Sequence, residues 1–482
     1  MKTLKPELIW KYFYEICQVP RPSKKEEKII KYLLDFGKQH KLETKKDAKG
    51  NVLICKPATK KYEGLQSVIL QSHMDMVCES LHGVKYNQDK DPIIPVIEGD
   101  WMKAKGTTLG ADDGIGMAAQ LALLASNDVE HGPIECLFTV DEETGLTGAK
   151  ALQKGFLKGN ILLNLDSEDE GEIFIGCAGG YDTSASFDFK KEKLSAGYST
   201  FTLSVLGLKG GHSGDEIHKG LGNSIKIMNR FLWHTIFSLK GKISTIDAGN
   251  KRNAIPREAI VSLSVPDKNV KALQDFFTKF EKDVRTENQV VEPTLVLKLE
   301  KAKKTAFVID NKTTDKLVKA LYACPHGVIA MSQDIPGLVE TSTNLASVKM
   351  VKNQIVVATS QRSSVESSKY DIANMVESVF LLAGAEAKHS DGYPGWAPDT
   401  KSKILAISKA SYKRLFKKEP VIRAIHAGLE CGLFLEKYPT LDMISFGPTL
   451  RGVHTPDEKI EIPTVQKFWD LMLDILKNIP KA

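Results

Sequence analysis

A histidine and a carboxylate lie close together near the start of this chain, where they could bind a metal ion. His73 and Asp75 follow the apolar run 67–70, and a similar arrangement recurs further along the chain. Each recurrence lies beside a short hydrophobic segment of strand type: Asp112-Asp113, Asp141-Glu142-Glu143, Asp166 and His454. Two histidines and several carboxylates, without a cysteine among them, are ligands typical of a borderline divalent metal ion such as zinc.

The number of these residues is sufficient for two metal ions. A two-metal site holds its ions about 3.5–4 Å apart by a shared ligand, and a carboxylate can fill that place. One bridging aspartate, together with one histidine and one further carboxylate for each ion, accounts for five residues: His73, Asp112, Glu143, Asp166 and His454.

Two acidic residues, Asp75 and Glu142, remain for other roles. Asp75 lies two positions beyond His73, so on an extended chain both side chains point the same way. A carboxylate there can accept the second imidazole N–H and orient the metal ligand. Glu142 precedes Glu143 directly and could take a proton from metal-bound water.

Each motif also has an ordinary structural explanation. Acidic residues such as Asp141-Glu142-Glu143, directly before a helix, commonly stabilise the positive end of the helix dipole. Asp112-Asp113-Gly114 is typical of a turn, and Asp166 could cap a helix. His454 could be a loop histidine. The occurrence of all these motifs in one chain, each beside a strand-like run, favours a metal site.

Composition excludes several classes of protein. The 482 residues are 42% hydrophobic and 26% charged, as in globular proteins of more than one domain. Sixty-six basic and 60 acidic residues leave a net charge of only +6, without a long basic block, so we expect no nucleic-acid partner.

No segment approaches the roughly 20 consecutive apolar residues of a membrane span, and residues 1–7 do not resemble a signal peptide. Seven dispersed cysteines fit reduced thiols in the cytoplasm.

Hydrophobic periodicity predicts an α/β fold. A helix is expected at 6–17, and Ser23-Lys-Lys-Glu26 resembles a capping box ahead of a second helix. Strands and helices then alternate, which indicates a mostly parallel sheet with helices on both faces. Strands are expected at 52–55, 67–71, 134–140 and 161–165, and helices at 114–125 and 147–156.

The middle of the chain predicts a separate α+β insert, with two similar halves. Its first half should contain strands near 201–205, 242–247, 258–265 and 293–300, and helices at 223–239 and 268–284. The α/β pattern returns with a helix near 402–416, a strand at 441–446 and a helix at 463–478. We therefore expect a discontinuous catalytic domain, 1–184 and 391–482, with a lid domain at 185–390.

Taken together, the motifs resemble the di-zinc aminoacylase and dipeptidase family, and within it the aminoacyl-histidine (Xaa-His) dipeptidases. The resemblance extends over essentially the whole chain. It rests on His73-Met-Asp75, Gly110-Ala-Asp112-Asp113-Gly114, Asp141-Glu142-Glu143-Thr-Gly145, Asn164-Leu-Asp166 and His454-Thr-Pro456, supported by the segments 71–78, 176–180 and 426–432.

The resemblance implies a role for each residue. His73, Asp112 and Asp166 would bind one metal, and Asp112, Glu143 and His454 the other, with Asp112 as the bridge and a cis peptide bond after it. Asp75 would orient His73, and Glu142 would be the general base. The ions would be two divalent metals per subunit, zinc above all, with cobalt or manganese as alternatives.

Three residues of the insert resemble lid positions. His212, in Gly210-Gly-His-Ser-Gly214, would polarise the scissile carbonyl, although a glycine-rich turn with an incidental histidine is the alternative. Asn253 and Arg362 would hold the terminal carboxylate of the substrate, a task that suits the guanidinium fork. Whether His212 serves its own active site or that of a neighbouring subunit is left open.

The implied activity is the hydrolysis of small dipeptides, Xaa-His (carnosine-like) dipeptides in particular, by a metal-bridged hydroxide with Glu142 as base. A broad-specificity dipeptidase and a deacylase of N-acyl amino acids use the same metal chemistry and remain alternatives. A metal-binding module without turnover is disfavoured by the complete ligand set and the spare glutamate. The resemblance also implies a homodimer, and the cysteines and the lack of an apolar span lead us to expect a cytoplasmic protein without a membrane partner.

Overall fold

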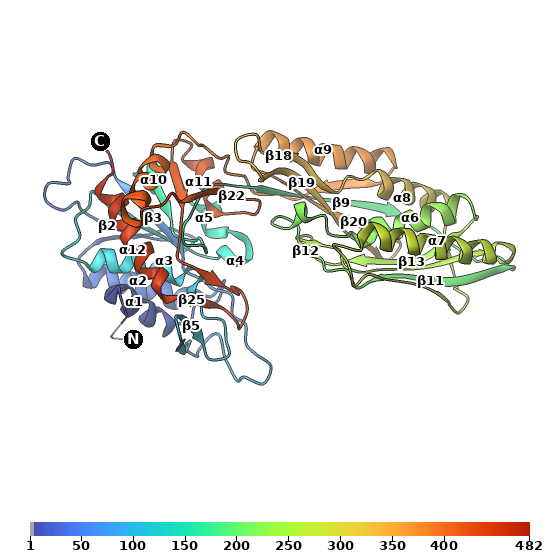
Figure 1. The fold of residues 1–482 in the computed structure, drawn as a ribbon, viewed down its shortest axis with the longest axis horizontal. Coiled ribbons are helices and arrows are strands. Elements are labelled where there is room, and N and C mark those ends of the chain that lie inside the picture. The colour runs from blue at the N-terminus through green and yellow to red at the C-terminus, as the bar shows by residue number, and fades with distance from the viewer. Residues whose placement is uncertain (1–3) are drawn as a thin grey trace. The chain divides into compact units, whose positions relative to one another are not determined.

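The computed structural model describes residues 4–482, which form two compact units (Figure 1). Unit 1 contains the chain up to Cys177 together with Trp396–Ala424 and Leu429–Ala482. Unit 2 contains Ala178–Gly395 and Ile425–Gly428. The start and the end of the chain, blue and red in Figure 1, therefore belong to the same unit.

Unit 1 contains an eight-stranded sheet in the order β1-β2-β6-β3-β7-β23-β8-β22. The four central strands, β6, β3, β7 and β23, run parallel, while β1, β2 and β8 pair antiparallel with their neighbours. Strands β3, β6 and β7 are buried at every position, as expected for strands covered on both faces. The strands are β1 (Glu43–Lys46), β2 (Val52–Lys56), β3 (Val68–His73), β6 (Ile134–Thr139), β7 (Ile161–Asn164), β8 (Glu172–Cys177), β22 (Val421–Ile425) and β23 (Asp442–Ser445).

Helices cover both faces of this sheet. Helix α3 connects β3 to β6, whereas α4 and α5 connect β6 to β7 in the opposite direction along the sheet. Because parallel crossovers are right-handed, α3 and α5 lie on opposite faces. The helices of this unit are α1 (Glu7–Cys17), α2 (Glu27–Gln39), α3 (Ala111–Ala125), α4 (Glu142–Gly145), α5 (Thr147–Ala151), α10 (Lys403–Phe416), α11 (Glu430–Lys437) and α12 (Ile462–Lys477).

Two details differ from the sequence-based expectations. The helix expected at 147–156 ends at Ala151, because Leu152 adopts an extended conformation. Ser23 does not cap α2: its hydroxyl donates to Asp75 Oδ2, and Glu26 accepts from the backbone of Lys24 and Asp141. A small sheet of four strands completes the unit, formed by β4 (Pro95–Glu98), β5 (Trp101–Ala104), β24 (Leu450–Arg451) and β25 (Lys459–Glu461).

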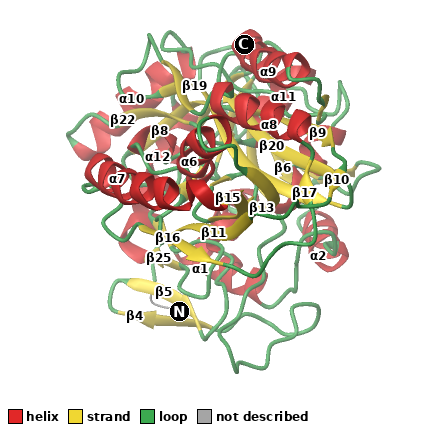
Figure 2. Ribbon diagram, turned by 90° about the vertical axis from the view of Figure 1, so that its right-hand side faces the viewer, coloured by secondary structure: helices red, strands yellow, loops and turns green. Residues whose placement is uncertain are grey.

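Unit 2 is an antiparallel sheet in the order β16-β11-β15-β13-β19-β20-β9-β21, with β18 paired to β19. Its strands are β9 (Gly179–Asp188), β11 (Tyr198–Leu206), β13 (Lys242–Gly249), β15 (Ala259–Pro266), β16 (Val296–Lys301), β18 (Gly327–Met331), β19 (Val339–Val351), β20 (Gln354–Ser363) and β21 (Glu386–His389). The helices α6 (Ser224–Phe237), α7 (Val270–Asn288), α8 (Asn311–Ala323) and α9 (Glu366–Leu382) pack on it (Figure 2). Their apolar sides and the strands form one hydrophobic core.

The two halves expected for the insert are present as a repeated order of elements. β11-α6-β13-β15-α7-β16 forms one half, and β9-α8-β19-β20-α9-β21 forms the other. Their strand orders mirror each other across the antiparallel pair β13–β19, where the halves join. The first half is inserted after β9 of the second, and the short strands β10 (Lys191–Glu192) and β17 (Val308–Ile309) pair at the two ends of the insertion.

All seven cysteines are free thiols. Over residues 4–482, no helix has both the length and the apolar character needed to cross a membrane.

Candidate metal centre

The predicted metal ligands of unit 1 follow neighbouring strands of the parallel sheet. His73 is the last residue of β3, Glu143 follows β6, and Asp166 follows β7. The register pairs His73 with Thr139 and Gln71 with Asn164, so the three strands end beside one another. This edge, at the carboxyl ends of the parallel strands, is where open α/β sheets bind their ligands.

Asp112 and His454 reach this edge from two loops. Asp112 lies at the start of α3, but its backbone and that of Asp113 are not helical, so the regular helix begins near Gly114 as predicted. The peptide bond between Asp112 and Asp113 is cis, as the family resemblance implied. His454 follows β24 and adopts a left-handed backbone conformation with a φ of 63°, which is uncommon for a residue with a side chain.

The five side chains form two groups that share Asp112. Asp112 Oδ1 lies 3.0 Å from His73 Nε2, and Asp166 Oδ1 lies 3.5 Å from the same nitrogen. Asp112 Oδ2 lies 3.1 Å from His454 Nε2, which is 2.9 Å from Glu143 Oε2. In each group the potential ligand atoms all lie within 4.8 Å of one another. The two oxygens of Asp112 thus face two different ligand groups.

The chemistry of this donor set fits two divalent cations. Imidazole nitrogens and carboxylate oxygens are suitable ligands for zinc and similar ions. Glu143 Oε1 is buried without a hydrogen-bond partner, although buried polar atoms are normally paired. A bound cation would satisfy that oxygen and compensate the concentrated negative charge.

The electrostatics of the metal-free site also favour the binding of cations. Burial, with the nearby charge of Asp112, raises the pKa of Asp166 to about 7, although His73 opposes this shift. Hydrogen bonds to Asp112 and Glu143 raise the pKa of His454 to about 11. In the absence of metal, protons therefore partly neutralise this group, and cations can replace them.

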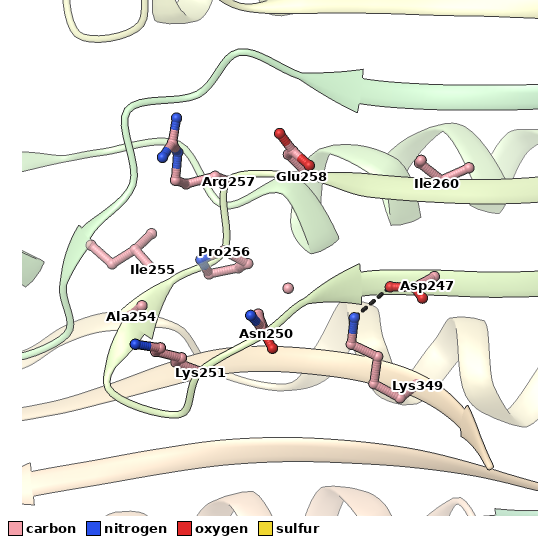
Figure 3. A pocket seen from close by; sticks show the side chains of 11 residues that line it. Asp247, Asn250, Lys251, Ala254, Ile255, Pro256, Arg257, Glu258, Ile260 and Lys349 are labelled. Atoms are coloured by element: carbon pink, nitrogen blue, oxygen red, sulfur yellow. Dashed lines mark hydrogen bonds and ion pairs between the residues drawn. The ribbon is translucent and has the colours of Figure 1, made fainter. Parts of the chain in front are cut away.

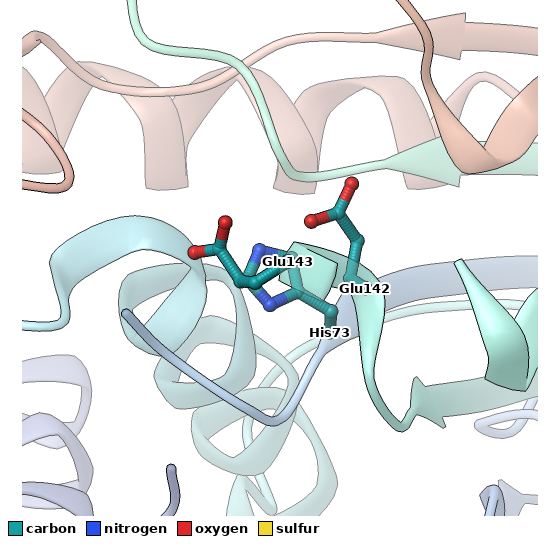
Figure 4. A group of neighbouring side chains, drawn as sticks. All are labelled: His73, Glu142 and Glu143. Carbon is teal, nitrogen blue, oxygen red and sulfur yellow. The ribbon is translucent and has the colours of Figure 1, made fainter. Parts of the chain in front are cut away.

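Glu142 lies beside the predicted metal ligands and forms a further candidate group with His73 and Glu143, whose ligand atoms all lie within 4.8 Å of one another. It starts the short helix α4, and its carboxylate diverges from that of Glu143 near the ring of His73 (Figure 4). Burial raises the pKa of the Glu142 carboxyl well above its ordinary value. A buried carboxyl with a raised pKa is suited to accept a proton at neutral pH and to return it.

Asp75 has more partners than its predicted role requires. Strand β3 ends at His73, so Asp75 lies in the following loop, where its backbone O is 3.2 Å and its Oδ1 3.5 Å from His73 Nδ1. The same carboxylate accepts from the backbone N–H of Glu142 at 3.0 Å and of Glu143 at 3.3 Å, and from Ser23. Asp75 therefore links the imidazole of His73 to the backbone that carries both glutamates.

Buried polar side chains on the three strands form a hydrogen-bonded row just before the predicted ligands. Gln71 Nε2 donates to Glu430 Oε2 at 2.6 Å, Thr139 Oγ1 donates to the same oxygen at 2.7 Å, and Asn164 Nδ2 donates to Gln71 Oε1 at 2.6 Å. Glu430 is fully buried, its second oxygen has no partner, and burial raises its pKa to about 8. The row connects three strands just before His73, Asp141 and Asp166.

Sequence reasoning missed further buried residues around the centre. Arg21, Glu26, Glu430 and Glu458 are all less than 9% exposed, which is unusual for charged side chains unless they are paired. Only Glu430 lies in a stretch that supported the family resemblance. The partners of Arg21 and Glu458 are backbone groups, which leave no pattern in the sequence.

Two predicted lid residues lie close together in unit 2. His212 belongs to β12 (Gly211–His212), which pairs with β14 (Ala254–Ile255). Its Nδ1 lies 3.4 Å from Asp215 Oδ2, and the backbone N–H of Ser213 donates to Asn253 O at 2.9 Å. This arrangement places Asn253, just before β14, next to the segment that carries His212.

Arg362, the third predicted lid residue, is mostly buried on β20. Its Nη1 donates to Tyr393 Oη at 3.0 Å, whereas its Nε is buried without a partner. Burial tends to raise the pKa of Asp215, but a hydrogen bond to His212 and the charges of His212 and Arg362 lower it below its usual value. Arg362 is therefore close enough to Asp215 for their charges to interact.

A separate pocket of about 560 Å³ in unit 2 lies along the β13–β15 connection (Figure 3). Asn250, Lys251 and Arg257 line it, and Lys349 forms an ion pair with Asp247 at one end. None of the predicted metal, catalytic or substrate-binding residues lines this pocket.

Comparisons with known proteins identify the family of the chain. The chain is 42% identical over 480 residues to the cytosol non-specific dipeptidase of Escherichia coli (strain K12), covering 100% of this chain and 99% of the relative. It matches the crystal structure of an aminoacylhistidine dipeptidase from Vibrio alginolyticus with a TM-score of 0.93 and 44% identity, over 100% of this chain and 98% of that one. The aminopeptidase PepT of Bacillus cereus, with 17% identity, a TM-score of 0.57 and 99% of each chain covered, shares the fold. Residues 69–478 match the model of peptidase family M20/M25/M40, and the chain belongs to this family.

Proposed function

We propose that this chain is a metal-dependent dipeptidase whose substrates include Xaa-His dipeptides. The observation that carries the proposal is the shared Asp112, whose two oxygens face two groups of metal ligands. The names of the Escherichia coli and Vibrio alginolyticus proteins support a dipeptide substrate.

Each residue of the proposed site has a separate role in hydrolysis. His73, Asp112 and Asp166 would hold one ion, and Asp112, Glu143 and His454 the other. When bound, two such ions supply Lewis-acid activation of water and of the scissile carbonyl. Glu142 takes the proton of the attacking water and delivers it to the leaving amine. Asp75 keeps His73 and the backbone of Glu142 in place while the proton moves.

The lid residues act on the substrate. His212 stabilises the oxyanion that develops at the carbonyl. Asn253 and the guanidinium of Arg362 bind the terminal carboxylate. The unpaired Nε of Arg362 supports this role, because it leaves a buried donor available for an anion.

Zinc is the proposed metal, because its preference for imidazole and carboxylate ligands fits the site. The proposed working form is a cytoplasmic homodimer without nucleic-acid or membrane partners, with a catalytic domain at 1–184 and 391–482 and a lid domain at 185–390. Family resemblance and the name of the Escherichia coli relative support the assembly and the location.

A substrate panel tests the function. The metal-free protein should be reconstituted with zinc, cobalt or manganese and given β-Ala-His, other Xaa-His dipeptides, Leu-Gly and acetylated amino acids. We expect chelator-sensitive hydrolysis of the dipeptides, fastest for Xaa-His. Equal rates for Leu-Gly would indicate a broad-specificity dipeptidase, turnover of acetylated amino acids alone would indicate a deacylase, and no turnover would refute the proposal.

A further inference from the structure

Two buried side chains of opposite charge hold the backbone that carries Asp112. Arg21 is 3% exposed and Glu458 is 2% exposed. Neither belongs to any of the groups of potential metal ligands found among residues 4–482. Both bind Gly110, two positions before Asp112: Arg21 contacts its carbonyl and Glu458 its N–H.

Glu458 accepts hydrogen bonds from four consecutive backbone amides. Its Oε2 accepts from Leu109 N at 2.8 Å and Gly110 N at 2.9 Å, and its Oε1 accepts from Ala111 N at 2.7 Å and Asp112 N at 3.3 Å. Hydrogen bonds to an ionised carboxylate are stronger than neutral ones. Glu458 lies four residues after His454, so it also ties the loop of one metal ligand to the loop of another.

Arg21 holds the same loop from its carbonyl side. Its Nη1 donates to Asp75 O at 2.7 Å and to Met74 O at 3.1 Å, while its Nη2 donates to Gly110 O. The guanidinium thereby connects the turn after His73 to the loop before Asp112. The fit leaves no room for a side chain at Gly110, because a Cβ there would lie 2.7 Å from Nη2.

These contacts matter because regular structure does not orient Asp112. Its backbone lies outside the regular part of α3, with a ψ of 113°. Its two oxygens nevertheless have to face different ligand groups, and a small rotation of the peptide would turn one of them away. Ligands that are held in position before the metal arrives bind it more tightly.

We propose that Arg21 and Glu458 form a positioning clamp that presents Asp112 to both metal ions and so sets the affinity of the centre. The clamp rests on the proposed two-metal function. Neither side chain belongs to a candidate ligand group, and each acts through the backbone of the Asp112 loop. Weakening either side of the clamp loosens both metal sites at once, because Asp112 is shared.

Metal titration of the whole protein tests the clamp. The variants are Glu458→Gln, which keeps the shape but loses the charge, and Arg21→Lys, which keeps the charge but loses the fork. Asp457→Asn is the control for the first, since Asp457 is the exposed neighbour of Glu458. Arg257→Lys is the control for the second, because Arg257 donates to the backbone carbonyl of Leu208 in unit 2. Each metal-free protein is titrated with Co²⁺ against a competing chelator, and its visible spectrum and metal-free melting temperature are recorded.

We expect both clamp variants to bind both Co²⁺ ions about 10- to 100-fold more weakly, the range typical of residues that support metal ligands. The cobalt spectrum should change in both, and the controls should match the wild type. Wild-type-like affinities and spectra together with lower metal-free melting temperatures would show that the residues only stabilise the fold, and would overturn the clamp.

Two further outcomes separate the clamp from the function on which it rests. A wild-type chain that binds fewer than two Co²⁺ ions would refute the two-metal centre, and the clamp with it. A wild-type chain that binds two ions but hydrolyses no dipeptide would refute only the proposed activity, because the clamp is measured by metal affinity. If one variant does not fold, the metal affinity of the other variant still tests the clamp, because each variant is predicted to weaken both metal sites.

Discussion

Glu142 and Glu143 are neighbours of the same type, yet their surroundings differ. Glu143 contacts His454, one of its oxygens lacks a partner, and it belongs to a candidate metal group with Asp112 and His454. Glu142 has a pKa raised well above its ordinary value by burial. At the scale of single residues, the proposed assignment of Glu143 as metal ligand and Glu142 as base rests on their positions relative to Asp112.

Replacement of Glu142 by glutamine should leave both metals bound and reduce kcat by about 100- to 10,000-fold, the usual effect of losing a general base. Metal content by mass spectrometry and steady-state kinetics with a dipeptide measure the two effects. Asp112→Ala is the contrasting variant, because it removes the shared ligand and should lose the metal. A fully active Glu142→Gln enzyme would refute the assignment.

Glu430 makes stability depend on pH in the metal-free protein. Burial raises its pKa from 4.5 to about 8, so between these values the folded chain keeps a proton that the unfolded chain has released. Its contribution to stability is complete below the lower value and is lost as the pH rises through the higher one. The melting temperature of Glu430→Gln relative to wild type should therefore rise between about pH 5 and about pH 8.

The control for this change is Glu436→Gln, an exposed position on the same helix, α11. Its melting temperature should differ from that of the wild type by the same amount at both pH values. A pH-independent difference for Glu430→Gln would mean that Glu430 does not hold a proton in the folded protein.

At the scale of elements, the join between the two halves of unit 2 depends on one glycine. Gly249, at the end of β13, pairs with Ser347 of β19 and has a φ of 63°. A Cβ at this position would collide with the carbonyl oxygen of Ala346. The strands can meet here because the residue lacks a side chain and tolerates a left-handed backbone.

Gly249→Ala should lower the free energy of unfolding by more than the roughly 1–2 kcal/mol of backbone strain that a left-handed alanine carries. Gly197→Ala is the matched control, since Gly197 has a φ of 77° and open space around its missing Cβ. Denaturant titration of both variants isolates the effect of the collision. Equal losses in the two variants would contradict a close contact at the join.

At the scale of the whole molecule, the metal centre connects the beginning and the end of the chain. His73 and His454 lie 381 positions apart in the sequence, and both contact Asp112. Bound ions would therefore stabilise unit 1 against unfolding, by about 2.7 kcal/mol for one site when the free metal is 100 times its Kd. Removal of metal should lower the melting temperature.

Metal binding should also depend on pH. The pKa of His454, raised to about 11 by Asp112 and Glu143 in the absence of metal, means that this imidazole is protonated at neutral pH. A metal ion has to displace that proton, so the apparent affinity falls as the pH falls. Calorimetry in two buffers of different ionisation enthalpy should detect proton release. Unchanged metal content after dialysis near pH 4 would contradict this linkage.

Much of the fold could be predicted because its signals are local. The alternation of strands and helices in unit 1 follows from short apolar runs, and the five predicted metal ligands stand beside those runs. The order of elements in the insert was also visible, since its strands and helices have clear hydrophobic periods. The helix at 147–156 was predicted too long, because the extended conformation of Leu152 is not encoded by the periodicity.

The sequence by itself determined which residues could bind metal, because histidine and carboxylate side chains carry that chemistry wherever they stand. Only the tertiary structure decided how they are held. Arg21 and Glu458 bind backbone groups 53 to 349 positions away, and every residue has such groups, so no motif marks these contacts. Ser23 is predicted to cap a helix, where its oxygen would accept from a backbone N–H. In the folded chain the helix begins only at Glu27, and the hydroxyl of Ser23 donates to Asp75 instead.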